Sequence, residues 1–357
     1  METKDSNITP APSRVKTVTG YVLRYGVPPV ITIGLCYLLF AKQDFGEMLR
    51  IIQRDCNYNW IVLALVISVF SHIFRAMRWS IQLRALDIKA SLFTLTLSIF
   101  GTYAVNLVFP RLGEVWRSGY VAQKQDAKFT TVFGSMIAER LADLFTVLFL
   151  IIITFIFAGN ELLAYLKQNE QMYEKVLAIV SSPWLWSGIA AIITGCVVLF
   201  ANSKDNKVVK KIKEFVTGLW NGFASIATMP GKGRWLLLTL CIWGCYFMQL
   251  YVAFFAFPIT SDVVSHYGVT AVLVCFVLSS ISMGVPSNGG IGPWQWAIIF
   301  GLSMYSAGVP GLTQAYSASF ANLVMGSQTL LLIALGLFTF VCIALSRRRS
   351  SRSASEK

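Results

Sequence analysis

The sequence predicts an all-α polytopic membrane protein with about six full spans, two broken or re-entrant hairpins inserted from opposite faces, and an inverted-repeat architecture. Three observations support this prediction. The 357 residues are 55% hydrophobic and only 13% charged, whereas soluble domains carry about 25% charged residues. Apolar runs near the ~20 residues that a helix needs to cross a bilayer recur along the chain. Lys and Arg gather in a few polar segments. A soluble globular domain, a disordered chain and a secreted disulfide scaffold are therefore excluded.

Six apolar runs are interpreted as full spans. They are Gly26 to Phe40, Trp60 to Trp79, Phe129 to Ala158, Trp184 to Ala201, Trp235 to Phe257 and Ala315 to Leu345. The first is expected to be a retained helix, because no small-residue cleavage site follows it. Two other stretches, Ser91 to Phe109 and Val269 to Tyr305, are apolar but interrupted by Gly, Pro and Asn.

The distribution of Lys and Arg predicts the orientation, because short cytoplasmic loops are enriched in both. Residues 1–20, the connection 202–234 and the tail 346–357 are basic, so we expect all three, and thus both termini, in the cytoplasm. The connections 159–183 and 258–267 should face outward. Ser91 to Phe109 has basic flanks on both sides and should therefore dip in from the cytoplasm and return. The number of membrane crossings must let the last helix end in the cytoplasm. The segment around Pro286 to Pro293 should therefore enter and leave from the outer face.

Breaks inside apolar segments free backbone groups that lipid cannot satisfy, so they persist only where protein or a wet cavity surrounds them. Interrupted segments at corresponding positions of two halves are typical of transporters with inverted repeats. We expect one transmembrane domain, 20–345, with halves of about 20–201 and 202–345. The first break should lie at Gly101 or within Asn106 to Gly113. The residues expected to form the breaks or gates are Gly101, Pro110, Gly113, Pro286, Gly289, Gly290, Gly292 and Pro293.

Charged residues also interrupt the apolar runs. Glu139, Arg140 and Asp143 lie within the run that begins at Phe129. Each charge buried in the bilayer costs ~2.5–3.5 kcal/mol, so the three require partners or water. Arg75 and Arg78 form part of a polar stripe in an earlier run, and Arg111, Glu114 and Arg117 follow one another at helical spacing after Pro110, which we expect to open a helix. A structural salt-bridge network and a substrate or proton site both remain open. Taken singly, Arg75, Arg78 and Arg117 also fit cytoplasmic-side anchors that extend to the membrane interface.

The second break offers neutral polar side chains around its glycines, either in a tight turn at the membrane surface or in a gate that contacts a headgroup. It lacks the strand and the Lys-Ser/Thr of a nucleotide-binding loop. The candidate substrate-binding residues are Arg75, Arg78, Asn106, Arg111, Glu114, Arg117, Glu139, Arg140, Asp143, Ser287, Asn288 and Gln295. Neither a metal nor a cofactor is expected, because the seven Cys lack metal-ligand spacing and His72 and His266 are isolated.

These motifs resemble those of a known family. Asn106, Pro110-Arg-Leu-Gly-Glu114 with Arg117, Glu139-Arg140 with Asp143, and Pro286-Ser-Asn-Gly-Gly-Ile-Gly292 are similar to the membrane region of the lysylphosphatidylglycerol synthase/flippase family, over roughly residues 20–345. In that family the region is implicated in moving aminoacylated phospholipid between leaflets, and a separate soluble domain makes the lipid. Because the tail after Leu345 is too short for such a domain, the resemblance implies a stand-alone flippase-like protein rather than an enzyme.

The expected function is therefore translocation of a lipid across a bacterial cytoplasmic (inner) membrane. The cargo could be an anionic or aminoacylated phospholipid or a polyprenyl-linked lipid, and nucleic acid is not an expected partner. Arg111, Arg117 and helix N-termini would hold phosphate, and Glu139 or Asp143 would meet a cationic group or carry a proton. Two alternatives remain: an integral-membrane enzyme acting on a lipid phosphate, and a non-transporting subunit that partners a separate lipid-modifying enzyme.

Overall fold

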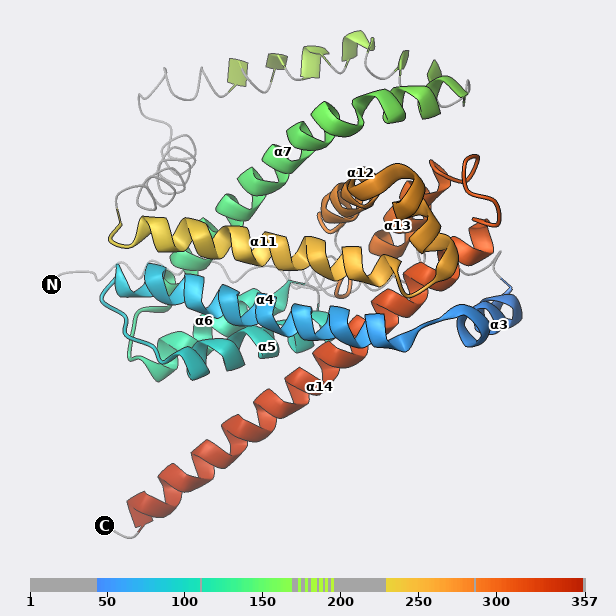
Figure 1. The fold of residues 1–357 in the computed structure, drawn as a ribbon. Coiled ribbons are helices and arrows are strands. Elements are labelled where there is room, and N and C mark those ends of the chain that lie inside the picture. The colour runs from blue at the N-terminus through green and yellow to red at the C-terminus, as the bar shows by residue number, and fades with distance from the viewer. Residues whose placement is uncertain are drawn as a thin grey trace, which may run out of the picture.

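The computed structural model describes residues 44–109, 111–168, a few short pieces between 173 and 195, 229–285 and 287–355. Every regular element in this described part is an α-helix, which confirms the all-α class (Figure 1). The helices are α3 (Phe45–Asp55), α4 (Tyr58–Arg84), α5 (Leu92–Val108), α6 (Leu112–Lys124), α7 (Phe129–Gln168), α11 (Lys232–Phe254), α12 (Pro258–Ser282), α13 (Pro293–Ser303) and α14 (Gln314–Ser355). By length and composition, α4, α11, α12 and the apolar parts of α7 and α14 are able to cross a membrane.

Four of the six predicted spans fall on these long helices, namely on α4, α7, α11 and α14. The predicted span from Gly26 to Phe40 and the tail 1–20 lie outside the described residues, as do Pro110, Pro286 and most of the range 184–228. The polytopic architecture is therefore confirmed, while the division into halves and the side of the membrane on which each terminus lies stay predictions.

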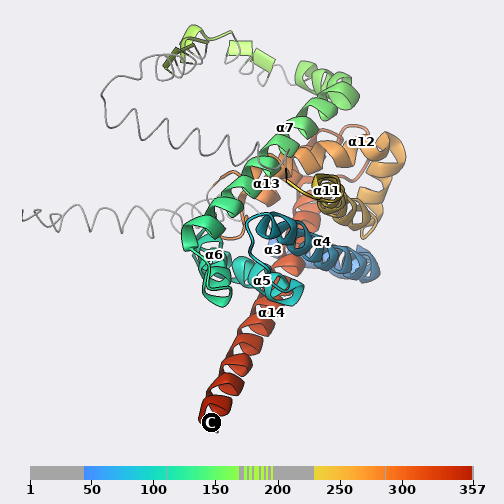
Figure 2. The ribbon, with the colours of Figure 1, turned by 90° about the vertical axis from the view of Figure 1, so that its left-hand side faces the viewer.

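Helices α4 and α11 run antiparallel at the centre of the bundle (Figures 1 and 2). The rings of Trp60 and Phe255 lie 5.4 Å apart at one end of the pair. At the other end, the guanidinium of Arg78 lies 5.3 Å from the centroid of the Trp235 ring. One buried apolar cluster joins α4 to α11, α12, α13 and α14, and a second joins α4 to α5, α6 and α7. Helix α4 is therefore shared by both packing units.

The first hairpin consists of α5 and α6. It begins just after α4, where the Ser91 hydroxyl accepts a hydrogen bond from the backbone N–H of Thr94 and caps α5. The two arms pack tightly, because a Cβ added at Gly113 would meet the backbone oxygen of Thr102. Between the arms, Arg111 adopts a left-handed conformation with φ 62° and serves as the N-cap of α6. Helix α6 therefore begins at Leu112, two residues later than a start at Pro110 would give.

The break of this hairpin lies in the Asn106 to Gly113 stretch, and the alternative at Gly101 is wrong. Gly101 lies inside α5, where an added Cβ would collide with the Trp116 ring of α6. The absence of a side chain at Gly101 lets the two arms approach each other and does not interrupt the helix.

The second hairpin consists of the end of α12, the turn 283–292 and α13. Pro293 occupies the first turn of α13, as the sequence predicts. Three glycines in the turn, Gly289, Gly290 and Gly292, have φ of 63°, 85° and 96°, values that favour glycine. The side-chain oxygen of Gln295 accepts a hydrogen bond of 2.6 Å from the Gly292 N–H and so caps the helix.

The segment 258–267, predicted to be a connection between spans, is helical. The side of the membrane that it faces stays a prediction. The segment forms the first part of α12, which starts at Pro258 and changes direction at Gly268, where φ is 67°. The hydroxyl of Thr260 donates to the backbone oxygens of Phe254 and Phe257 and ties this helix start to the end of α11. The prediction missed the helix because Pro258 reads as a break, although proline also suits the first turn of a helix.

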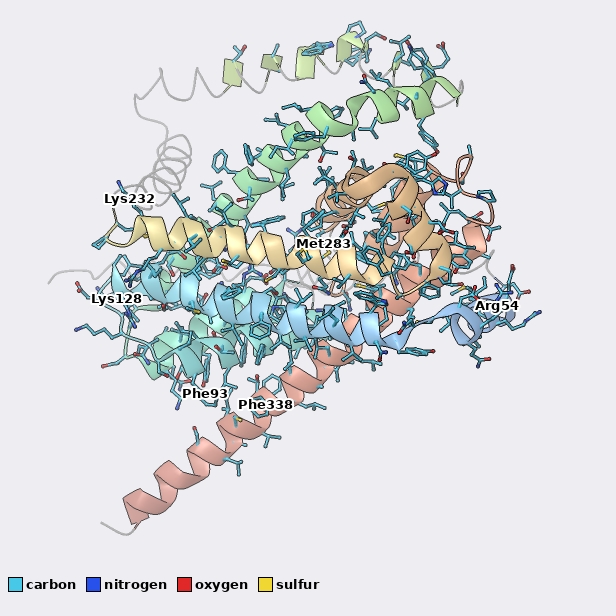
Figure 3. The ribbon with its side chains drawn as sticks, viewed as in Figure 1. Arg54, Phe93, Lys128, Lys232, Met283 and Phe338 are labelled. Carbon is cyan, nitrogen blue, oxygen red and sulfur yellow. The ribbon has the colours of Figure 1, made fainter. Side chains whose placement is uncertain are left out.

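The two hairpins begin at opposite ends of the bundle, and their tips meet. Lys128, which follows the first hairpin, lies at the same end as Lys232, whereas Arg54 lies at the opposite end, near the base of the second hairpin (Figure 3). At the tips, the Asn288 side-chain amide donates to the backbone oxygen of Leu107 at 3.2 Å. The guanidinium of Arg111 donates to the backbone oxygen of Gly284 at 2.7 Å. This is the arrangement expected for two hairpins inserted from opposite faces.

Candidate functional site: a buried ion network beside the hairpin tips

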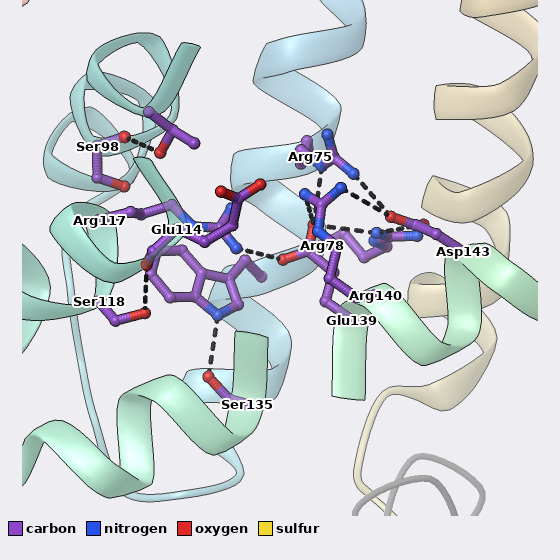
Figure 4. A network of polar contacts seen from close by, with 12 residues as sticks. Arg75, Arg78, Ser98, Glu114, Arg117, Ser118, Ser135, Glu139, Arg140 and Asp143 are labelled. Carbon is purple, nitrogen blue, oxygen red and sulfur yellow. Dashed lines mark hydrogen bonds and ion pairs between the residues drawn. The ribbon is translucent and has the colours of Figure 1, made fainter. Parts of the chain in front are cut away.

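Six charged side chains from three helices form one network in the interior of the bundle (Figure 4). They are Arg75 and Arg78 of α4, Arg117 of α6, and Glu139, Arg140 and Asp143 of α7. The spacings of three and four residues within α4 and α7 place the side chains of each helix on one face. The structure therefore brings together these six of the twelve candidate residues.

The two carboxylates hold the network together. Glu139 Oε1 accepts from Arg75 at 2.8 Å and from Arg78 at 3.1 Å, and its Oε2 accepts from Arg117 at 3.0 Å. Asp143 accepts from the same two α4 arginines, at 2.7 Å and 2.9 Å. All four carboxylate oxygens are thus engaged by guanidinium groups. Charge-assisted hydrogen bonds of this kind are roughly twice as strong as neutral ones.

Arg140 is the loosely held member of the network. Its nitrogens lie 3.9 Å from Glu139 and 3.8 Å from Asp143, and its side chain is 40% exposed. The side chains of the other five residues are between 0% and 13% exposed. The network is therefore closed in this conformation except at the edge formed by Arg140 and Asp143.

Neutral and aromatic groups complete the surroundings of the arginines. The Arg75 guanidinium donates to the hydroxyls of Tyr103 at 2.7 Å and Tyr246 at 3.4 Å. Arg78 donates to the Thr239 hydroxyl at 3.3 Å. Arg117 lies 4.2 Å from the centroid of the Trp79 ring, a cation–π distance. Such groups stabilise buried cations without adding negative charge.

Sequence reasoning missed these neighbours, because single Tyr, Thr and Trp residues in an apolar run carry no periodic signal. Trp235, at the start of an apolar run, is only 3% exposed, and its ring lies against Arg78.

Arg111 and Glu114 do not join the network. Arg111 contacts the second hairpin and Arg117 contacts Glu139, so the two have different partners here. Their predicted cooperation at one phosphate stays a prediction. The Glu114 carboxylate accepts from the Asn106 amide at 3.3 Å, and Asn106 in turn accepts from the Gly113 N–H at 2.8 Å. Asn106 and Glu114 therefore fasten the tip of the first hairpin.

The predicted polar residues of the second hairpin have separate roles. Asn288 contacts the first hairpin and Gln295 caps α13, which places both at the hairpin and not at the ion network. The Ser287 hydroxyl is buried and has no hydrogen-bond partner within the described part of the chain.

A chain of uncharged polar groups runs beside the network and was also missed. The Gln249 amide donates to Gln328, whose amide donates to the Ser68 hydroxyl, at 2.9 Å and 2.8 Å. Ser68 in turn lies 3.5 Å from His72, which is only 3% exposed. The sequence suggested that this histidine is isolated. The two glutamines of the chain could not be foreseen, because they come from α11 and α14, more than 170 residues away from His72.

The described residues hold no cluster of three or more metal-ligating side chains. An open depression of about 720 Å³ lies at the other end of the bundle, between α3 and the start of α14, and includes Arg50 and Arg54. It does not reach the ion network.

Comparison with known proteins places this architecture in a family. The profile of the lysylphosphatidylglycerol synthase TM region matches residues 27–336. The chain belongs to this family. One relative is a UPF0104 membrane protein of Methanocaldococcus jannaschii, which is 25% identical over 226 residues, 62% of this chain and 84% of the relative. No solved structure gives a significant match. The family match spans both hairpins and the ion network, and it confirms the resemblance drawn from the motifs.

Proposed function

We propose that this chain moves the polar headgroup of a membrane lipid between the two leaflets, without chemical conversion of the lipid, in a bacterial cytoplasmic (inner) membrane with both termini in the cytoplasm. The observation that supports this proposal best is the meeting of two hairpin tips, inserted from opposite ends, beside a buried ion network. A lipid headgroup crosses hydrocarbon only where polar groups replace its water. The network and the polar hairpin tips supply such groups inside the bundle.

The tip contacts form the closed gate of the proposed pathway. Hydrogen bonds at the tips link Arg111 to Gly284 and Asn288 to Leu107, and a Cβ at Gly289 would press on Leu107. Parting the tips costs a few hydrogen bonds, each contributing about 0.5–3 kcal/mol. Transporters with inverted repeats open to each side in turn by rocking one half against the other. In this proposal, the opened gate admits the headgroup while the acyl chains stay in lipid.

Cross-linking of the tips tests the proposed gate. Leu107→Cys and Asn288→Cys together place one thiol on each tip, and oxidation or a short bismaleimide would lock them. The purified chain is reconstituted in vesicles with lipids labelled on an acyl chain, and transfer to the outer leaflet is followed by chemical quenching. We expect the reduced variant to move lipid faster than protein-free vesicles and the locked variant to lose that movement.

The parent chain with its native cysteines, treated in the same way, controls for unrelated cross-links. Equal movement by the locked and reduced forms would contradict the proposed gate. If the unmodified chain moved lipid no faster than protein-free vesicles, the proposal that it translocates lipid would be wrong. Chemical conversion of the labelled lipid would favour the enzyme alternative.

A further inference from the structure

We propose that the ion network is a binding site for the phosphate of an anionic lipid headgroup and that it disfavours cationic, aminoacylated headgroups. This inference rests on the proposed function and specifies its substrate class. The sequence left anionic, aminoacylated and polyprenyl-linked lipids open. The arrangement of charges in the network distinguishes anionic from aminoacylated headgroups.

The network contains more positive than negative charge. Four guanidinium groups, those of Arg75, Arg78, Arg117 and Arg140, face two carboxylates. Glu114, one turn before Arg117 on α6, forms no ion pair among the described residues, and counting it still leaves a positive excess. Charges in a low-dielectric interior are weakly screened, so a resident excess attracts anions and repels cations.

Every carboxylate oxygen of the network already accepts from an arginine. The donor–acceptor distances at Glu139 and Asp143 are 2.7–3.1 Å. Each oxygen keeps lone-pair capacity, but an ammonium group could reach it only beside a guanidinium, and like charges at such short range repel strongly in a low-dielectric interior. These contacts therefore argue against a role of the two carboxylates in binding a lysyl or similar cationic group.

The arginines, in contrast, have donors to spare. The Nε–H groups of Arg78, Arg117 and Arg140 are buried and lack an acceptor within the described residues. The side chains of Arg78 and Arg117 are 0% and 1% exposed, so bulk solvent does not reach them. Buried donors without acceptors are costly, and a phosphate oxygen is the acceptor that guanidinium geometry suits best. Three such donors within one network indicate a site that is completed by an anion.

Arg140 provides the entrance to this site. It is the exposed member of the network and lies at 3.8–3.9 Å from the carboxylates, so it can turn toward an incoming phosphate without breaking a short ion pair. We expect Arg140 to make the first contact with the headgroup. Arg140→Gln removes one unit of excess charge and is the substitution in the network least expected to disturb folding.

Headgroup selectivity is measured in the vesicle assay with labelled phosphatidylglycerol, phosphatidylethanolamine and lysylphosphatidylglycerol, whose headgroups are anionic, zwitterionic and cationic. We expect the anionic lipid to move fastest and the cationic one slowest. Arg140→Gln should lower the transfer rate of the anionic lipid roughly tenfold, the effect of one charge-assisted hydrogen bond. The transfer rates of the three lipids should therefore become more similar. Lys124→Gln, an equal charge change at an exposed site on α6, serves as the control and should change nothing.

Binding is measured separately, as the rise in the unfolding temperature of the detergent-solubilised chain on adding short-chain phosphatidylglycerol, short-chain phosphatidylethanolamine or inorganic phosphate. Stabilisation by phosphatidylglycerol that Arg140→Gln weakens supports the inference. Equal stabilisation by phosphate alone would assign the site to a free anion and overturn the lipid assignment.

The two proposals fail in different ways. Movement of lysylphosphatidylglycerol at least as fast as phosphatidylglycerol would overturn the selectivity and leave translocation intact. Anion binding without movement of any lipid would overturn translocation and leave the anion site intact.

Discussion

Glu139 should be the residue on which the stability of the network depends most. It lies on α7, its side chain is 0% exposed, and it is the acceptor that joins Arg117 of α6 to the two arginines of α4. Glu139→Gln keeps the size of the side chain and removes its charge. The substitution therefore tests the electrostatic contribution without creating a cavity.

The expected magnitude follows from the contacts. Glu139 accepts three charge-assisted hydrogen bonds, and each loses about 1 kcal/mol when the acceptor becomes neutral. The amide also presents an N–H group to guanidinium donors, and the positive excess of the network rises. We therefore expect a loss of ~3–5 kcal/mol, the range for a buried ion pair that loses one partner. Asp143→Asn, with two such bonds and a partly exposed carboxylate, should cost ~2 kcal/mol.

Both variants are assayed in mixed micelles, by unfolding with increasing sodium dodecyl sulfate and following the helical circular dichroism signal. Glu47→Gln, on the exposed side of α3, controls for the loss of a carboxylate as such. A free energy of unfolding for Glu139→Gln within 1 kcal/mol of the unmodified chain, or a smaller loss than for Asp143→Asn, would refute the reasoning.

Two further predictions concern neighbours of the network. Gly113→Ala should destabilise the chain by ~2 kcal/mol or more, because the added methyl group would force the arms of the first hairpin apart; Gly119→Ala, on the same helix with open space around it, should be neutral or slightly stabilising in the same unfolding assay. Tyr103→Phe should cost ~1.5–3 kcal/mol and Tyr246→Phe less, because their hydroxyls lie 2.7 Å and 3.4 Å from the Arg75 guanidinium. Equal costs for the two tyrosines would contradict the hydrogen-bond assignment.

The sequence predicted the hairpins because their signals are local. Proline and glycine in an apolar stretch indicate a break wherever they occur, and Pro293 indeed begins α13. The position of the first break was ambiguous for the same reason. A glycine that allows close packing between helices, as Gly101 does, cannot be distinguished by its neighbouring sequence from a glycine that interrupts a helix.

The site was predicted in part. Charges inside an apolar run require partners, and the spacing on α4 and α7 identified which side chains share a face. Spacing along one helix gives no information on which helix lies opposite. The sequence therefore could not show that Arg111 and Arg117 have different partners. Arg111 contacts the second hairpin, whereas Arg117 binds Glu139. The hydroxyl groups around Arg75 were missed because their positions depend on packing between helices that are distant in sequence.

All the ion pairs of the network join residues between 75 and 143, in the first part of the chain. Helix α11, from the later part, contributes only the neutral partners Tyr246, Thr239 and Trp235. A displacement of the later helices past the earlier ones would therefore separate no opposite charges within this network. The ion network would move as one rigid unit. The energy barrier to such a motion would depend on the weaker contacts that the neutral side chains of α11 make with the network.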